Sequence, residues 1–430
     1  MNTIAFYTLG CKANQAETAA MEQLAAEAGC TVVPFGNPAD ITVINSCTVT
    51  QTADKKSRQV LRRARALSPD GIVAVCGCYA QREAESLVAE GLADIAHGNR
   101  DHAAFLSAAI SAASSRARSF YHTEDAVFRP LPAAVLAGRT RALLKVQDGC
   151  EMHCSYCIIP QMRGKNRCIS PSEAEAQARA AAAAGARELV LTGIEVSSYR
   201  YEENGEVTTF AGLVRRICLA APEMRIRLGS LEPRLVDEEF CRLAELQNLC
   251  PHFHLSLQSG SDETLRRMRR QYNTARYARS LSDLRAAFPD VCITTDLICG
   301  FPGETEEEFE RSLSFVTACR FLKVHIFPYS RRTGTEAAGL PDQILRTEKE
   351  ARCRRAAAAC AAVTEELLAS YIGRTLPVLC EDSPGEGLMQ GYAPNYIPVT
   401  FPGGEELHNT VQSVRITAVS GECLRGEAVL

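Results

Sequence analysis

The chain has 430 residues, of which 46% are hydrophobic and 23% charged, and its formal net charge is −4. One hydrophobic core seldom serves a chain of this length, so two to four domains are expected. The slightly acidic balance excludes a uniformly basic nucleic-acid-binding protein, and an RNA partner would have to bind local basic patches. Without a long apolar run or a charged signal peptide, the sequence predicts a cytoplasmic protein with no membrane contact.

The first part of the chain alternates between strand-like and helix-like patterns. Short β-rich runs at 3–10, 41–45 and 71–77 are separated by helical stretches at 16–29 and 53–68. This βαβ pattern predicts an N-terminal parallel α/β domain over residues 1–122. The charged, proline-containing stretch at 122–140 is typical of a linker.

The same alternation resumes over a longer stretch. Each of six apolar runs lies beside a helical pattern; the runs are 141–147, 188–194, 226–232, 252–260, 291–301 and 323–330. Six such units predict a (β/α)6 partial barrel over residues 136–370, closed by a helix at 348–371. Residues 371–430 carry strand and turn signals and almost no helical pattern, which predicts a small β-barrel.

Nineteen cysteines are many for a cytoplasmic chain, where disulfides are rarely kept. Three of them, Cys150, Cys154 and Cys157, lie within eight positions and form a CxxxCxxC pattern. Three local thiolates can hold a cubic iron–sulfur cluster and leave one iron without a protein ligand, where chemistry can take place. The alternative is a zinc site completed by His153 or Cys168.

Three further cysteines stand far apart in the sequence but in similar places. Cys11, Cys47 and Cys78 each follow a predicted strand, and neighbouring parallel strands end at one edge of their sheet, where ligands bind. The pattern predicts that the three converge and again leave an iron unligated, although three unrelated loop cysteines remain the alternative. Cys76 competes with Cys78, but it lies inside an apolar run. The scattered cysteines are expected to be small buried hydrophobes.

The CxxxCxxC pattern, with Tyr156 before its third cysteine, is similar to the signature of radical S-adenosylmethionine (SAM) enzymes. Together with several other segments it resembles the methylthiotransferase family of these enzymes. The segments are TLGCKANQAET, INSCTVT, GCYAQ, VQDGCEMHCSYCIIPQMRGKNR, LTGIEVSSY, SLEP, HLSLQSGSDETLRRMRR, TDLICGFPGETEEEF and HIFPYSRRTGT, and the last sixty residues resemble its RNA-binding TRAM domain.

The resemblance implies two 4Fe–4S clusters and SAM as cofactors, and replacement of a substrate C–H bond by C–SCH₃. Cys150, Cys154 and Cys157 would hold the cluster that cleaves SAM, and Cys11, Cys47 and Cys78 the auxiliary cluster that carries the transferred sulfur. Further expected partners are the anticodon stem-loop of tRNA and an electron donor such as flavodoxin or ferredoxin, with the enzyme a monomer.

Members of the family act on threonylcarbamoyl-adenosine in tRNA, on isopentenyl-adenosine in tRNA, or on an aspartate of a small-subunit ribosomal protein. The segments here are most similar to the threonylcarbamoyl-adenosine type, in which the methylthio group is added next to the anticodon. Glu195 departs from the polar residue or histidine common in that type. An alternative of another class is a non-catalytic iron–sulfur sensor that binds RNA.

Two further sets of residues are candidates for binding. Those expected near SAM lie at or beside predicted strand ends; they are Tyr156, Gly193, Glu195, Ser230, Glu232, Gln258, Ser259 and Gly300. Those expected to bind RNA are cations and aromatic residues; they are Lys55, Lys56, Arg58, Arg62, Arg266, Arg269, Tyr392 and Tyr396. Arg270 belongs to the same basic run as Arg266 and Arg269, and Arg163, just past the Cys150 loop, is a candidate to extend the same RNA path. Solvated helix faces and a tyrosine in a barrel core are the plain alternatives.

Overall fold

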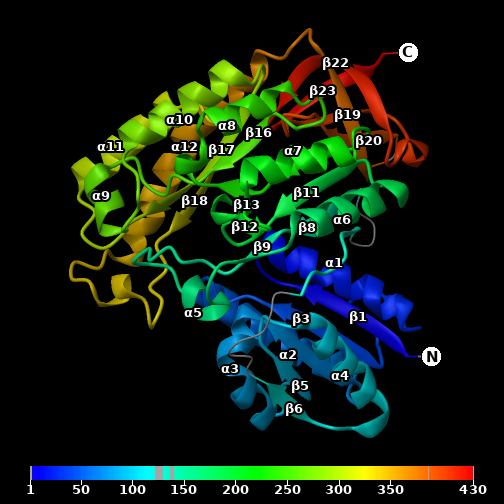
Figure 1. The fold of residues 1–430 in the computed structure, drawn as a ribbon. Coiled ribbons are helices and arrows are strands. Elements are labelled where there is room, and N and C mark those ends of the chain that lie inside the picture. Colours follow the sequence, from blue (N-terminus) through cyan, green and yellow to red (C-terminus); the bar gives the residue numbers. More distant parts are fainter. Residues whose placement is uncertain (1, 122–128, 136–139, 386, 430) are drawn as a thin grey trace.

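The computed structural model describes residues 2–121, 129–135, 140–385 and 387–429, which form three units in chain order (Figure 1). The predicted linker at 122–140 lies largely outside the described residues. In the view of Figure 1 the N-terminal unit lies at the bottom, the long middle unit lies above it, and the C-terminal unit packs against the middle unit at the upper right. None of the described helices is long and apolar enough to cross a bilayer.

The N-terminal unit is a six-stranded, all-parallel sheet with helices on both faces, as the sequence predicts. Its strand order is β2-β1-β3-β4-β5-β6. The apolar residues of α1 and α4 pack on one face and those of α2 and α3 on the other. The elements are β1 (Thr3–Thr8), α1 (Lys12–Glu27), β2 (Thr31–Val33), β3 (Ile41–Ser46), α2 (Gln51–Leu67), β4 (Ile72–Gly77), α3 (Cys78–Ala89), β5 (Ile95–His97), α4 (His102–Ser115) and β6 (Ser119–Tyr121).

The middle unit is an open α/β barrel, and its six parallel strand positions confirm the predicted (β/α)6 pattern. Its main strands form two four-stranded sheets, of order β14-β11-β8-β7 and β15-β16-β17-β18, and β9 with β10 and β12 with β13 form two separate two-stranded sheets. The predicted third strand is divided into β14 and β15, where the amide of Gly229 donates to the carbonyl of Leu191 at 2.8 Å. A parallel bridge from Ile226 to Leu249 continues the connection between the sheets.

The bounds of the middle unit's strands are β7 (Ala134–Val135), β8 (Arg141–Lys145), β9 (Gln147–Asp148), β10 (Arg167–Cys168), β11 (Glu188–Thr192), β12 (Arg200–Glu203), β13 (Glu206–Thr209), β14 (Arg225–Leu228), β15 (Ser230–Leu231), β16 (His252–Leu255), β17 (Cys292–Cys299) and β18 (Lys323–Pro328). Its helices are α5 (Ile159–Arg163), α6 (Pro171–Ala183), α7 (Phe210–Ala220), α8 (Glu238–Cys241), α9 (Asp262–Arg267), α10 (Thr274–Ala287), α11 (Glu306–Ala318) and α12 (Arg346–Ala369).

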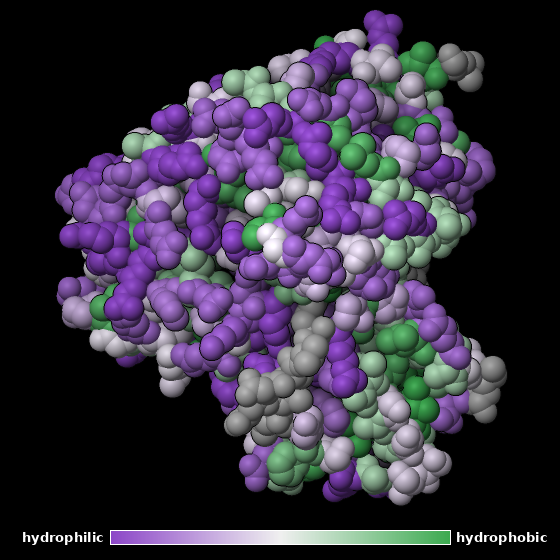
Figure 2. Space-filling view, in the orientation of Figure 1, coloured by the Kyte–Doolittle hydropathy of each residue, from purple (hydrophilic) through white to green (hydrophobic). Residues whose placement is uncertain are grey.

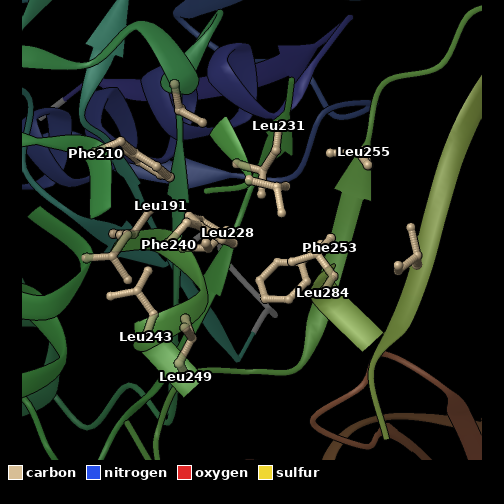
Figure 3. Packing of buried hydrophobic residues seen from close by; sticks show 14 of the residues in the cluster. Leu191, Phe210, Leu228, Leu231, Phe240, Leu243, Leu249, Phe253, Leu255 and Leu284 are labelled. Carbon is tan, nitrogen blue, oxygen red and sulfur yellow. The ribbon is translucent and has the colours of Figure 1, made fainter. Parts of the chain in front are cut away.

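The main core of the middle unit lies between its strands and its outer helices. Phe210, Phe240 and Phe253 belong to it, together with leucines from the strands (Figure 3). A separate small cluster joins Ala16 of α1 to Leu143 of β8 and Val190 of β11. The first helix of the N-terminal unit therefore packs directly on the strands of the barrel.

The C-terminal unit is a closed five-stranded barrel, which confirms the predicted small β-barrel. Its order is β19-β20-β21-β23-β22, and its bounds are β19 (Thr375–Gly385), β20 (Leu388–Tyr392), β21 (Pro398–Pro402), β22 (Val411–Ser420) and β23 (Cys423–Ala428). Closure leaves no free sheet edge. Figure 2 shows hydrophilic side chains over most of the visible face of the middle unit, with apolar ones in small groups.

Candidate active site

Cys11, Cys47 and Cys78 lie together at one edge of the N-terminal sheet. Cys11 immediately precedes α1, Cys47 follows β3 and Cys78 begins α3. The strands β1, β3 and β4 are parallel neighbours, so these positions share an edge. Contact between the segments is close, because a β-carbon placed on Gly10 would lie 3.2 Å from the Sγ of Cys47. Burial raises the pKa of Cys47 to about 12, and the neighbouring Cys78 and Cys11 add to the rise.

The side chain of Cys76, the competing candidate, lies on the other face of the sheet from α3, the helix that Cys78 begins. This side chain is fully buried in the apolar cluster beneath α1 and α4. Cys78, two residues later, opens α3 and lies beside Ile158 and Met162 of the middle unit. The change from strand to helix at Gly77 therefore separates the two thiols.

Cys150, Cys154 and Cys157 stand on the loop between β9 and α5. The amide of Met152 lies 3.4 Å from the Sγ of Cys150, and the amide of Ile159 donates to Cys157. Burial raises the pKa of Cys150 to about 11 and that of Cys157 to about 12, so the free thiols are neutral. Ionising these thiols requires a nearby positive charge such as bound iron. The amide donors that point at the sulfur atoms fit thiolates that bind iron.

Within the described ranges, no group of three His, Cys, Asp or Glu side chains is arranged to hold a single metal ion. Ligands of a four-iron cluster each bind a different iron, so they stand farther apart than the ligands of one ion. Both cysteine sets offer only soft thiolate donors with amides nearby. This donor chemistry fits an iron–sulfur cluster.

Arg270 and Glu232 form a buried ion pair beside the Cys150 set. The two Nη2–carboxylate distances are 2.5 and 2.7 Å, and Nη1 of the same guanidinium lies 3.2 Å from the Sγ of Cys154. Burial raises the pKa of Glu232, and the Arg270 charge opposes that rise. Tyr156 interacts with the same group, since the charge of Arg270 opposes the rise in the pKa of Tyr156 that burial causes. Its ring packs edge-on against Phe301, 6.4 Å between centroids.

Glu195 has a buried oxygen that no group in the described part of the chain satisfies. Its Oε2 accepts from Arg234 at 2.9 Å and from Ser198, whereas its Oε1 is buried without a partner. The side-chain oxygen of Gln147 fixes the turn by accepting from the amides of Ile194 and Glu195 at 2.9 and 2.8 Å. A buried acceptor of this kind fits a donor group on a ligand, such as the amino group of SAM.

The other SAM candidates divide into two groups. Gly193 and Ser230 line a large cavity. The structure does not bring Ser259 there, because its fully buried hydroxyl bonds Ser312 of α11 at 3.0 Å. Gly300 adopts a φ of +71° and packs against Lys349 of α12, and Gln258 adopts a φ of +70° where its carbonyl bonds the amide of Ile298.

That cavity, of about 910 Å³, joins all three units. Cys11 contributes from the N-terminal unit, the ends of β11 and β15 from the middle unit, and Tyr392 and Tyr396 from the C-terminal barrel. His254 and His325 add polar groups to its wall. The cavity is large enough for a nucleoside, and every unit contributes groups to its wall.

Arg163 connects the segment that carries the Cys150 set to the helix that follows Cys11. It ends α5, the helix that follows the Cys150 loop, and it is fully buried. Its guanidinium donates to Glu17 and, at 2.8 Å, to the side-chain oxygen of Asn14, both in α1. Burial raises the pKa of Cys78, and the adjacent Arg163 opposes that rise. The interpretation of Arg163 as an RNA contact is therefore wrong, because a fully buried side chain cannot reach phosphate.

The cations of the basic runs differ in their exposure and in whether they form ion pairs. Lys55, Lys56, Arg62 and Arg266 are exposed. Arg58 pairs with Glu90 and lies 3.3 Å from the hydroxyl of Tyr79, and Arg269 pairs with Glu336 at 2.8 Å. Arg270 is committed to Glu232, which makes the RNA interpretation of that residue wrong as well.

Tyr392 and Tyr396 face inward. Their rings stack on each other, 5.0 Å between centroids, and the guanidinium of Arg141 lies 4.5 and 5.0 Å from the two centroids. Burial tends to raise the pKa of Tyr396, but Arg141 and Lys12 lower it overall. In this position the two rings line the cavity, which is required if they stack on a base of the RNA. They are also packed against the middle unit, which is required if they are core residues.

Sequence reasoning missed Gln147, Glu17 and the role of Arg163. A signal was present for one of them, since Gln147 is the last residue of the first predicted barrel strand, and ligand-binding side chains stand at such strand ends. Glu17 had no such signal, because it lies within a helix whose buried side depends on contact with another unit.

Comparisons with known proteins agree with this arrangement. A model of the Radical SAM superfamily matches residues 144–316, Uncharacterized protein family UPF0004 matches 3–98, and the TRAM domain matches 369–429. The chain is 38% identical over 425 residues to threonylcarbamoyladenosine tRNA methylthiotransferase MtaB of Bacillus subtilis, covering 97% of this chain and 94% of that protein.

Another relative is tRNA-2-methylthio-N(6)-dimethylallyladenosine synthase of Syntrophotalea carbinolica, which is 32% identical over 442 residues and covered over 100% of both chains. Among solved structures, the radical S-adenosylmethionine methyltransferase TsrM of Kitasatospora setae superposes with a TM-score of 0.57 at 13% identity, covering 90% of this chain and 77% of that chain. At this identity the likeness shows the fold alone.

Proposed function

Because the chain belongs to the methylthiotransferase family of radical SAM enzymes, we propose that it converts threonylcarbamoyladenosine next to the anticodon of tRNA to its 2-methylthio derivative. The relative of that name is 38% identical over nearly the whole chain, and a dimethylallyladenosine synthase is 32% identical. The observation that carries the proposal is the shared cavity, because Cys11 and the strand ends beside the Cys150 set line it together.

Cys150, Cys154 and Cys157 would hold one 4Fe–4S cluster, and Cys11, Cys47 and Cys78 a second. When bound, the clusters and SAM supply the radical that removes hydrogen from the substrate and the methylthio group that replaces it. The orphaned Oε1 of Glu195 is available to the amino group of SAM. Arg270 opposes the rise in the pKa of Glu232 that burial causes, and it donates toward Cys154, which stabilises negative charge on that sulfur.

The substrate adenosine would enter the cavity with its base between the two cysteine sets. Val49 lines the cavity, and α2 begins two residues later. From this closeness in sequence we infer that the exposed Lys55 and Lys56 of α2 bind phosphates of the anticodon stem-loop outside the cavity. We also expect the enzyme to act in the cytoplasm as a monomer, with flavodoxin or ferredoxin as electron donor.

Mass spectrometry of tRNA nucleosides tests the proposal. Cells lacking the protein should retain threonylcarbamoyladenosine and lose its 2-methylthio derivative. Wild-type protein should restore the derivative, and a Cys150→Ala variant should not. Loss of the methylthio group from isopentenyladenosine instead would establish the alternative tRNA substrate, and unchanged tRNA with an unmodified ribosomal aspartate would establish the protein substrate.

A further inference from the structure

Lys12 is a cation of the cavity wall that lacks a carboxylate partner. It is the first residue of α1, directly after Cys11, and both residues line the cavity. Its ammonium nitrogen lies 5.8 Å from the ring centroid of Tyr396. In the described part of the chain, no carboxylate comes within ion-pairing distance of it.

The other charged groups of the cavity wall each have a hydrogen-bond or ion-pair partner. Asp296 lies 3.1 Å from Nε2 of His254, and Lys323 lies 2.5 Å from Glu422. The remaining histidines of the wall, His252 and His325, have lowered pKa values, chiefly because they are buried. Lys12 is thus the cation of this wall whose charge is left for a ligand.

The groups behind Lys12 make this end of the cavity more positive still. Two carboxylates are present, and each is already paired: Glu188 with Arg227 at 2.6 Å, and Glu381 with Arg141 at 2.6 Å. Arg225, on the same strand as Arg227, donates to the carbonyls of Tyr392 and Pro377 and has no carboxylate partner in the described residues. A cavity end with surplus cations attracts an anion and disfavours another cation.

The substrate proposed above carries such an anion. A threonylcarbamoyl group on adenosine ends in a free carboxylate, whereas an isopentenyl group is a neutral hydrocarbon. A hydrocarbon placed against Lys12 would cover a charged group without pairing it, which is unfavourable.

We propose that Lys12 binds the carboxylate of the amino-acid group on the substrate adenosine and thereby selects this substrate over an adenosine with an apolar group. This inference rests on the proposed function, because it concerns the same cavity and the same reaction. The base would lie against Tyr396, and the carboxylate would approach the ammonium group beside the ring.

The test uses reconstituted holoenzyme and two anticodon stem-loop RNAs that differ at one group. One RNA carries threonylcarbamoyladenosine, and the other carries the same nucleoside with its carboxylate converted to the amide. Wild-type enzyme should bind the acid about 10- to 100-fold more tightly, the range expected for a hydrogen bond between charged partners. Lys12→Met should bind the two RNAs alike and leave affinity for the amide unchanged.

Lys349→Met is the matched control, because its ammonium bonds the carbonyl of Tyr329 outside the cavity. It should keep the preference for the acid. Iron content is measured for each variant, so that loss of a cluster is not mistaken for loss of recognition.

Two results would overturn the inference, and they separate it from the proposed function. If wild-type enzyme methylthiolates the threonylcarbamoyl RNA but binds acid and amide equally, the role of Lys12 is wrong and the function stands. If it methylthiolates only isopentenyladenosine RNA, both are wrong. The wild-type comparison needs no variant, so it holds even where Lys12→Met fails to fold.

Discussion

Glu188 illustrates how single residues of the barrel are held ionised away from water. It is fully buried in β11, and Arg227 of β14 donates to both of its oxygens at 2.6 and 2.9 Å. Burial alone would raise the pKa of Glu188, but Arg227 and Arg141 lower it from 4.5 to about 2. The pair lies directly beneath the tyrosines that line the cavity, since Arg227 also lies 4.6 Å from the centroid of Tyr396.

We predict that Glu188→Gln removes a pH-dependent part of the stability. Because the folded-state pKa lies below the unfolded one, the ionised carboxylate stabilises the fold fully above about pH 4.5 and progressively less as the pH falls toward 2. The free energy of unfolding of wild type should exceed that of the variant by roughly 3 kcal/mol at pH 7, and the difference should shrink with acid. Denaturant unfolding across this range measures it.

Glu206→Gln, at an exposed carboxylate of β13, is the control and should change stability little at any of these pH values. A Glu188→Gln difference that stays constant from pH 7 to the acid limit would show that the carboxylate is not held ionised by Arg227.

At this scale the sequence allowed only part of the site to be predicted. The cysteines were found because thiolate ligands recur at recognisable spacings and strand ends. Arg163 and Arg270 were misassigned because a cation in a basic run is usually solvated. Their burial depends on Glu17 and Glu232, which come from distant segments and cannot be paired with them by any local pattern.

At the scale of elements, the junction between β4 and α3 fixes the position of Cys78. Gly77 adopts a φ of +92°, and a β-carbon there would lie 2.3 Å from the carbonyl oxygen of Ser46. Ser46 is the residue before Cys47, so the same contact sets the distance between two of the three cysteines. Only glycine fits both the backbone conformation and the close approach.

We predict that Gly77→Ala selectively disrupts the cluster proposed for Cys11, Cys47 and Cys78. The alanine must displace either α3 or the end of β3, which separates Cys78 from Cys47. Iron content after anaerobic reconstitution should fall by about half, as one of two four-iron clusters is lost. Electron paramagnetic resonance of the reduced protein should retain the signal of the other cluster.

Gly91→Ala is a matched control, because Gly91 also has a positive φ, of +71°, but a β-carbon placed there would meet no atom of the described residues within 4 Å. It should cost stability through backbone strain and keep all of the iron. Full iron content in Gly77→Ala would mean that this junction does not position a cluster ligand.

The order of elements was largely predictable, because periodicity alone distinguishes strands from helices over long stretches. The position of α1 was not. The helix begins at Lys12, four residues before the predicted start, and its residues Ala16 and Glu17 contact the middle unit. That contact is decided by tertiary packing, which also explains why Glu17 is buried in a helix of ordinary composition.

At the scale of the whole molecule, the three units meet around one cavity, and buried polar contacts cross both boundaries. Arg163 joins the middle unit to α1, and Arg227 donates to the carbonyl of Pro394 in the C-terminal barrel at 3.0 Å. The inward tyrosines mean that one face of this barrel completes the cavity. If the chain binds tRNA as proposed, binding of the surrounding RNA would depend on exposed cations elsewhere, and those of α2 are the candidates.

We predict that Lys55→Ala combined with Lys56→Ala weakens binding of tRNA and lowers its dependence on salt. Each lost phosphate contact should reduce the slope of log K against log salt by about 0.7 to 0.9. Fluorescence anisotropy with a labelled anticodon stem-loop over a series of salt concentrations measures both quantities.

Arg279→Ala combined with Arg346→Ala removes the same charge from exposed positions on α10 and α12, far from α2 in the chain. It should leave the slope unchanged. If the slope of log K against log salt is the same for the two double variants, the RNA binds to a surface other than α2.

The central claim is that two cysteine sets from two units each hold a cluster beside one cavity. Iron analysis of the anaerobically reconstituted protein tests it most directly, with wild type measured beside two triple variants. We expect about eight irons per chain in wild type, and about four when either Cys150, Cys154 and Cys157 or Cys11, Cys47 and Cys78 are all replaced by alanine. About four irons in wild type, unchanged by replacing the second set, would contradict the claim.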